Sequence, residues 1–95
     1  MENMIQITTD NGFACTIDKS SMDDMRILDA LVDLQNGAKM DQIVALRTIT
    51  DRLLGGEQKE ALYKHLEETL GRASTGAVQS ELFDIFTKIG EAAKK

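Results

Sequence analysis

Proline and tryptophan are absent from this 95-residue sequence, and cysteine and histidine occur once each. The single cysteine, Cys15, excludes an internal disulfide and fits a reducing compartment. His65 has no second imidazole to complete a zinc site, and a nucleophilic Cys15 would need it as its activating base. We therefore expect Cys15 to be a small buried apolar residue and His65 to be exposed or to cap a helix. The sequence predicts no metal, no cofactor and no enzymatic activity.

Aromatic residues are also scarce, with three Phe and one Tyr. The hydrophobic share of 42% is nevertheless enough for a folded domain, so the core must be mainly aliphatic. No apolar run approaches the roughly 18 residues of a membrane-spanning helix. The start of the chain also lacks the basic and apolar segments of a signal peptide. We expect a cytoplasmic protein that does not associate with a membrane.

Basic residues are outnumbered, because 11 Lys and Arg face 16 Asp and Glu, for a net charge of −5. Such a chain repels polyanions at long range, and no basic stripe offsets this, so we expect no binding to nucleic acid. Aspartates crowd residues 23–33, but they lack the ligand spacing and central glycine of a calcium loop. We assign them to a solvated helix face and to the positive end of a helix.

Residues 1–18 are expected to form a β-hairpin. Apolar residues alternate with a period of two in two short runs, and Asn11-Gly12 lies between them. This pair predicts a type I′ turn, in which both residues take positive φ. Because an isolated hairpin is marginal in water, it should pack on the helices or pair with another chain, which leaves self-association open. The alternating residues are Ile5 and Ile7 in the first run and Phe13, Cys15 and Ile17 in the second.

About four short helices are expected in the helical region, residues 20–89. Their expected spans are 22–35, 40–54, 57–70 and 76–89. The expected boundaries are Ser20 or Ser21 as the first cap, a left-handed Gly37, the pair Gly55-Gly56, Gly71, Ser74 or Thr75 as the last cap, and fraying at Gly90 before a polar tail, 90–95. The sequence thus predicts one α+β domain, residues 1–95, that is mostly α.

Each helix carries an apolar stripe that should face the core. In the first helix this stripe is Met25, Leu28, Leu31 and Val32, widened by Ile27 and Leu34. The last helix is apolar over an unusually wide arc, because Phe83 lies beside an inward stripe of Val78, Leu82, Ile85, Phe86 and Ile89. An overly wide stripe often marks a partner surface. We expect Phe83, Phe86 and Ile89 to bind a partner, together with Tyr63.

Four segments carry a resemblance to a known family: Leu53 to Leu66, Gly71-Arg72, Ala77-Val78, and Glu81 to Phe86. In these segments the sequence resembles the tail assembly chaperones of long-tailed (siphovirus-type) phages and prophages of Gram-positive bacteria. The resemblance covers most of the chain. It departs at Ala73, where such proteins tend to carry Val or a similar residue after the Gly-Arg pair.

The resemblance implies a protein without catalytic activity that binds the tape-measure protein, and in some members the tail-tube protein. Such chaperones keep these clients soluble in the host cytoplasm until the tube polymerises, and they are absent from the mature virion. Two other classes stay open: a structural head–tail or tail-completion protein, and a small acidic adaptor or regulator that binds a host protein.

Overall fold

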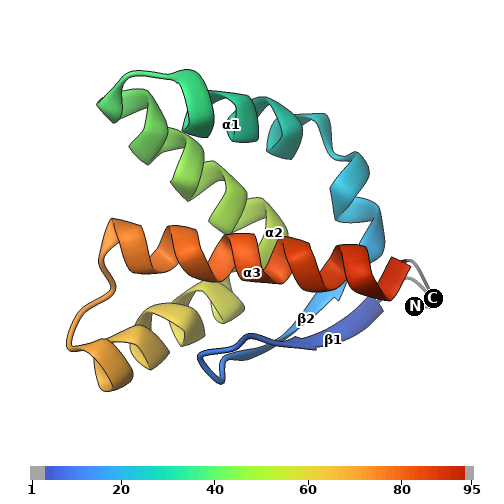
Figure 1. The fold of residues 1–95 in the computed structure, drawn as a ribbon, viewed down its shortest axis with the longest axis vertical. Coiled ribbons are helices and arrows are strands. Elements are labelled where there is room, and N and C mark those ends of the chain that lie inside the picture. Colours follow the sequence, from blue (N-terminus) through green and yellow to red (C-terminus); the bar gives the residue numbers. More distant parts are fainter. Residues whose placement is uncertain (1–3, 94–95) are drawn as a thin grey trace.

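The computed structural model describes residues 4–93 of the chain. It has an α+β fold that is mostly helical and begins with a two-stranded antiparallel hairpin, as the sequence predicts (Figure 1). The elements in chain order are β1 (Met4–Thr8), β2 (Ala14–Asp18), a short 3-10 helix η1 (Lys19–Asp23), α1 (Met25–Asn36), α2 (Lys39–Leu70) and α3 (Thr75–Ala93).

The described residues contain three α-helices, so the expectation of about four was wrong. The two helices expected at 40–54 and 57–70 form one element, α2, with no loop between them. A single residue, Gly55, leaves the helical conformation, with φ 78° and ψ 169°. Glycine has no Cβ, so it can adopt this conformation and redirect the chain within one residue. The two halves of α2 accordingly run in different directions (Figure 1).

The hairpin pairs β1 with β2 in the register Ile5 opposite Ile17 and Ile7 opposite Cys15. The prediction of a type I′ turn was wrong. That turn needs positive φ at both Asn11 and Gly12, but only Gly12 has it, with φ 90°. The Gly12 N–H donates to the Thr9 carbonyl at 2.9 Å. The Thr9 N–H in turn donates to the Phe13 carbonyl at 2.8 Å, which closes a three-residue loop. A turn followed by one left-handed glycine is the usual geometry of such a loop.

Helix α1 begins three residues later than expected, because η1 takes up the residues before it. Its cap is Asp24, whose carboxylate accepts from the Arg26 N–H at 2.9 Å, and neither Ser20 nor Ser21 fills this role. At its other end Gly37 is extended, with φ −79°, and the expected left-handed closure is wrong. A larger residue does not fit at this position, because a Cβ on residue 37 would lie 2.6 Å from the Asp33 carbonyl oxygen.

The apolar stripe expected to face the core from α1 is confirmed for Ile27 and Leu34 and wrong for Met25 and Val32. The structure buries Ile27, Ala30 and Leu34, while Met25 is 63% exposed and Val32 is 57% exposed. The sequence of α1 contains two apolar stripes on different sides of the helix, and periodicity alone does not say which one meets a neighbour. Because α1 packs mainly on α2, only one of the two stripes is covered.

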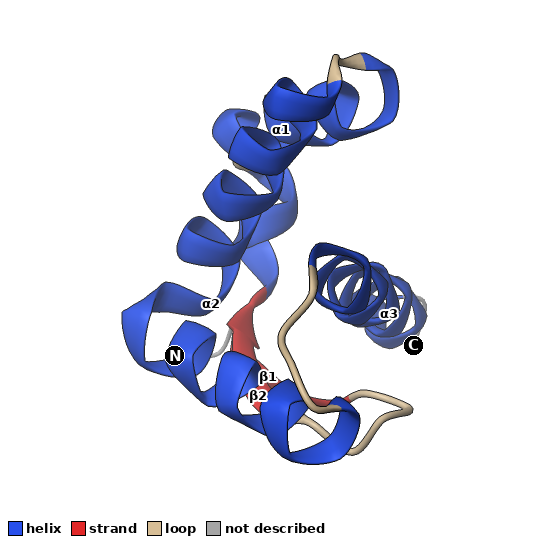
Figure 2. Ribbon diagram, turned by 90° about the vertical axis from the view of Figure 1, so that its left-hand side faces the viewer, coloured by secondary structure: helices blue, strands red, loops and turns tan. Residues whose placement is uncertain are grey.

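Helix α3 begins after Ser74, whose hydroxyl accepts from the Ala77 N–H at 3.2 Å, as the capping prediction required. It runs to Ala93, so the expected end at Gly90 and the tail from there were wrong, and Lys94 and Lys95 lie outside the described residues. Gly90 keeps negative φ and lowers helix propensity without ending the helix. The helix crosses the molecule in front of α2 (Figure 1), is seen nearly end-on beside α2 in Figure 2, and packs on α2 and β1.

Candidate functional site

One side of α3 holds the hairpin turn through a buried hydrogen bond. The Thr9 hydroxyl donates to Glu81 Oε1 at 2.8 Å and accepts from the Phe13 N–H at 3.1 Å. Glu81 is only 7% exposed, although it is ionisable. A buried carboxylate needs hydrogen-bond partners to offset its lost hydration, and Thr9 supplies one. This contact therefore fixes the turn against the middle of α3.

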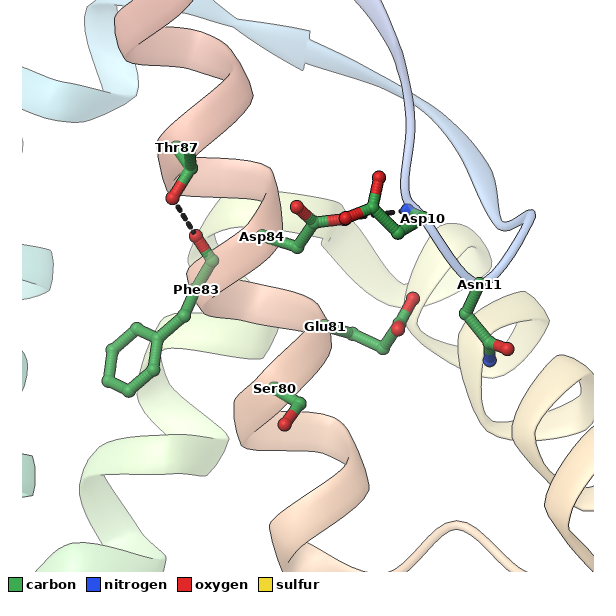
Figure 3. A pocket seen from close by; sticks show the side chains of 7 residues that line it. All are labelled: Asp10, Asn11, Ser80, Glu81, Phe83, Asp84 and Thr87. Atoms are coloured by element: carbon green, nitrogen blue, oxygen red, sulfur yellow. Dashed lines mark hydrogen bonds between the residues drawn. The ribbon is translucent and has the colours of Figure 1, made fainter.

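A second set of polar contacts joins the tip of the turn to the same side of α3 (Figure 3). The Asp10 N–H donates to Asp84 Oδ2 at 2.7 Å. The Lys88 ammonium donates to Asp10 Oδ1 at 3.0 Å and to Asp84 Oδ1 at 3.3 Å. These hydrogen bonds, the one to Asp10 first, raise the pKa of Lys88 above its ordinary value. The like charges of the two carboxylates are therefore partly balanced by one cation.

The C-terminal half of α2 holds the turn from another direction through His65. Its Nε2–H donates to the Asn11 carbonyl at 2.9 Å, and its ring lies 5.8 Å from the ring of Phe13. The expectation of an exposed or capping histidine was therefore wrong, because His65 is half-buried and bridges two distant segments. Its role here is structural.

Cys15 is buried, as the sequence predicts. Burial, and to a lesser extent the charge of Glu81, raises the pKa of its thiol to about 11. The thiol is therefore protonated at neutral pH.

An open hollow of about 550 Å³ lies beside the turn (Figure 3). The carboxylates on its wall are already engaged by Lys88 and by main-chain and hydroxyl donors of the hairpin. Within residues 4–93, no group of three or more His, Cys, Asp or Glu side chains has the arrangement to hold a metal ion. The lining residues are Asp10, Asn11, Ser80, Glu81, Phe83, Asp84 and Thr87.

The residues expected to bind a partner do not lie together. Phe83 is 38% exposed and projects away from the hairpin turn (Figure 3), and Phe86 is half-buried one turn further along. Ile89 is only 3% exposed and belongs to the core, so it offers no surface in this fold. Tyr63 is half-buried on the C-terminal half of α2 and packs against the core. Phe83 and Phe86 are thus the members of this set that share a face of α3.

The sequence reasoning missed the exposed stripe of α1. Met25, Leu28 and Val32 follow the spacing i, i+3, i+7, and so occupy one side of the helix. The apolar residues of α1 cover an arc too wide to be buried against one neighbouring helix, but all of them were assigned to the core. In the structure these side chains form an uncovered or half-covered apolar strip.

The exposed strips of α1 and α3 lie on two separate helices. A small pocket of about 80 Å³ lies between Leu34 of α1, Leu46 of α2 and Gln79 of α3, and no residue of either strip lines it. Met25 and Val32 lie on the side of α1 opposite the buried Ile27 and Leu34, so this strip points away from α2. The α1/α3 face is the name used below for the two exposed strips together: Met25, Leu28 and Val32 of α1 with Phe83 and Phe86 of α3.

The pocket between the three helices has little charge, because Lys39 is its single charged lining residue. The remaining lining residues are polar but uncharged or apolar: Leu34, Gln42, Ile43, Leu46, Thr75 and Gln79. The exposed strips do have charged neighbours, since Asp29 and Asp33 follow Leu28 and Val32 in α1, and Phe83 lines the hollow that Glu81 and Asp84 also line. The strips themselves are apolar and are suited to an apolar partner.

No protein-family model matches the chain, and neither a curated protein nor a solved structure matches it significantly. Among the helices within residues 4–93, none is both long and apolar enough to cross a membrane.

Proposed function

We propose that this protein is a tail assembly chaperone that binds the tape-measure protein of a long-tailed phage or prophage and keeps it soluble during tail assembly. The tail-tube protein is a further client of the same kind. The protein acts in the host cytoplasm by binding alone, without catalysis or a cofactor, and leaves before the virion is complete. The family resemblance suggests this role, and the surface of the chain supports it.

The observation that carries the proposal is the second apolar stripe of α1. Met25 and Val32 are 63% and 57% exposed, yet they continue the helical spacing of a packing stripe. Exposing such a stripe costs solubility, so a chain that retains one requires a partner to cover it. Phe83 adds an exposed aromatic ring on α3, and aromatic residues are enriched at partner contacts.

The spacing of the exposed strips indicates the kind of client. Met25, Leu28 and Val32 follow helical spacing, so a partner helix can pack its own apolar stripe along them. Met25 has no branch at Cβ and a flexible side chain, so it adapts to clients whose apolar residues differ in shape. The net charge of −5 keeps the chaperone itself in solution while the face is uncovered.

The test is co-expression with the long helical protein encoded beside this gene, followed by a solubility assay and pull-down. The proposal predicts that this client becomes soluble and co-purifies only when the chaperone is present. Failure of the wild-type chain to capture or solubilise the client would overturn the proposed function.

Two variants locate the binding face in the same assay. Val32→Asp and Phe83→Ser each place a polar group on the α1/α3 face, and each should reduce captured client about tenfold or more. Leu70→Asp is the matched control, because Leu70 is 60% exposed at the far end of α2. If the two variants capture client as the wild type does, the client binds elsewhere.

Particle analysis separates the proposal from a structural tail role. A head–tail or tail-completion protein remains in purified particles, whereas a chaperone is present in the lysate and absent from the particles. An adaptor for a host protein would leave the solubility of the tape-measure protein unchanged.

A further inference from the structure

The two edges of the hairpin differ in how their main-chain groups are satisfied. The Thr9 N–H bond to the Phe13 carbonyl marks this pair as hydrogen-bonded. Pairs alternate along an antiparallel ladder, so Gln6 and Thr16, which face each other, form a non-hydrogen-bonded pair. The N–H and C=O groups of both residues therefore point outward, toward opposite edges of the sheet.

Helix α2 closes the outer edge of β2. The Gln58 side chain accepts from the Thr16 N–H at 2.7 Å and donates to the Thr16 carbonyl at 3.0 Å. One amide group thus takes both bonds that a neighbouring strand would make. A further bond from Gln58 to the Leu54 carbonyl at 2.9 Å holds this amide in place.

The outer edge of β1 has no equivalent partner within residues 4–93. The sheet contains only β1 and β2, and no hydrogen bond from the described residues reaches the outward main-chain groups of Gln6 or Thr8. A hollow of about 310 Å³ lies along this edge, bordered by Lys88 and Glu91 near the end of α3. The edge is therefore open on the side where another strand would lie.

We propose that the outer edge of β1 pairs with β1 of a second copy of this chain, antiparallel and with the two-fold axis at Gln6. This register makes Gln6 hydrogen-bond with Gln6 of the second copy. It also aligns Met4 with Thr8 of the second copy, and Thr8 with Met4. These are the residues whose main-chain groups point outward, so each outward donor meets an outward acceptor. The result is a continuous four-stranded antiparallel sheet.

The composition of β1 favours a second copy as the occupant. Edge strands usually carry charges or proline that prevent pairing, whereas no residue from Met4 to Thr9 is charged. In a chain with a net charge of −5, this uncharged strand is where two copies approach with little like-charge repulsion. The pairing also sets Ile5, which is half-buried in the single copy, opposite Ile7 of the second copy.

Pairing of two five-residue strands buries little surface, so the dimer should be weak and dissociate on dilution below about 10 µM. Sedimentation velocity of the isolated full chain from about 10 µM to about 1 mM should show monomer converting to dimer. A wild-type chain that stays monomeric throughout this range would overturn the inference.

Gln6→Pro tests the edge directly. It removes the outward N–H of Gln6 but none of the bonds to β2, and proline is tolerated at this kind of edge position. We expect the dissociation constant to rise at least tenfold with an unchanged circular dichroism spectrum. The control Gln6→Thr keeps the N–H and should dimerise as the wild type does. Equal dimerisation of Gln6→Pro and wild type would place the interface elsewhere.

Gln6→Cys gives an independent readout that does not depend on tolerance of proline. At a hydrogen-bonded antiparallel pair the Cα atoms lie about 5.5 Å apart, within the range of a disulfide. Mild oxidation of this variant should yield a covalent dimer through the introduced thiol, whereas Glu60→Cys, on an exposed helix surface, should yield far less. Equal cross-linking of the two variants would contradict the proposed register. None of these measurements uses the client, so they stand or fall separately from the proposed function.

Discussion

The two sides of α3 differ in what their side chains contact. On the hairpin side Glu81, Asp84 and Lys88 all form bonds to residues of the turn. On the side away from the hairpin turn, Phe83 remains 38% exposed and Phe86 is half-buried. One side of the helix is thus occupied by contacts within the chain, and the other carries apolar surface that the chain itself does not cover.

This difference separates stability from binding on a single helix. Substitutions on the hairpin side should lower the free energy of unfolding and leave the α1/α3 face intact. Substitution of Phe83, on the side away from the hairpin, should change stability little and weaken binding of the partner. The predictions below break or sharpen this separation, beginning with the largest expected effect.

Glu81→Ala should lower the free energy of unfolding by about 2–3 kcal/mol, because it leaves the buried Thr9 hydroxyl without its acceptor. Chemical denaturation measures this loss. Phe83→Ala, on the other side of α3, should cost less than about 1 kcal/mol, since its ring is partly in water. Glu81→Gln keeps an oxygen acceptor and should recover part of the loss. Equal costs for Glu81→Ala and Phe83→Ala would remove the distinction between the two sides.

Gly55→Ala should lower the free energy of unfolding by about 1–2 kcal/mol, because a residue with a side chain is strained at φ 78°. Gly55 joins the half of α2 under α1 to the half that holds the hairpin turn, so the substitution should also disturb their relative placement. Gly56→Ala is a matched control one residue away. Gly56 has negative φ and no atom within 4 Å of an added Cβ, so alanine there should be neutral or stabilising by about 0.5 kcal/mol. Similar costs at both positions in thermal denaturation would argue against the break at Gly55.

The pH dependence of stability should report on the start of α1. A hydrogen bond from Arg52, and a further one from the Arg26 N–H, lower the pKa of Asp24 below its ordinary value of 3.8. A lowered folded-state pKa stabilises the fold above that ordinary value, and this contribution is lost as the pH falls through the folded-state pKa.

Asp24→Asn isolates this contribution, because asparagine still caps a helix but does not titrate. As the pH falls below about 4, the melting temperature of this variant should fall less steeply than that of the wild type. At pH 7 its melting temperature should be slightly lower than that of the wild type. The effect should be the smallest of the series, since Asp24 and Arg52 form a partly solvated pair. Parallel profiles for the two proteins would show that this pair contributes nothing measurable.

Local sequence signals predicted the hairpin, the break at Gly55 and the stop at Gly71, because each depends on a few adjacent residues. The inward faces of the strands followed from strict alternation, and Phe13, Cys15 and Ile17 are all buried. The turn type was missed because Asn11-Gly12 fits both a two-residue loop and a three-residue loop with one left-handed glycine.

The contacts that hold the hairpin on the helices could not be predicted from the sequence. Thr9 and Glu81 are 72 positions apart, and Thr16 and Gln58 are 42 apart, so no local pattern connects them. The prediction of the buried side of α1 was partly wrong for a different reason. Its periodicity identifies apolar sides, but only the packing of α1 on α2 decides which side is buried.

The most direct test of the α1/α3 face is methyl NMR of the methionines in the free chain and in the complex co-purified with the tape-measure client. Met25 lies on this face, and Met4 lies on the hairpin, so the two methyl groups report on the two regions within one sample. Single Met→Leu substitutions assign the signals. We predict that the Met25 signal is shifted or broadened in the complex while the Met4 signal stays in place. A shift of Met4 with an unchanged Met25 would contradict the account and place the client on the hairpin.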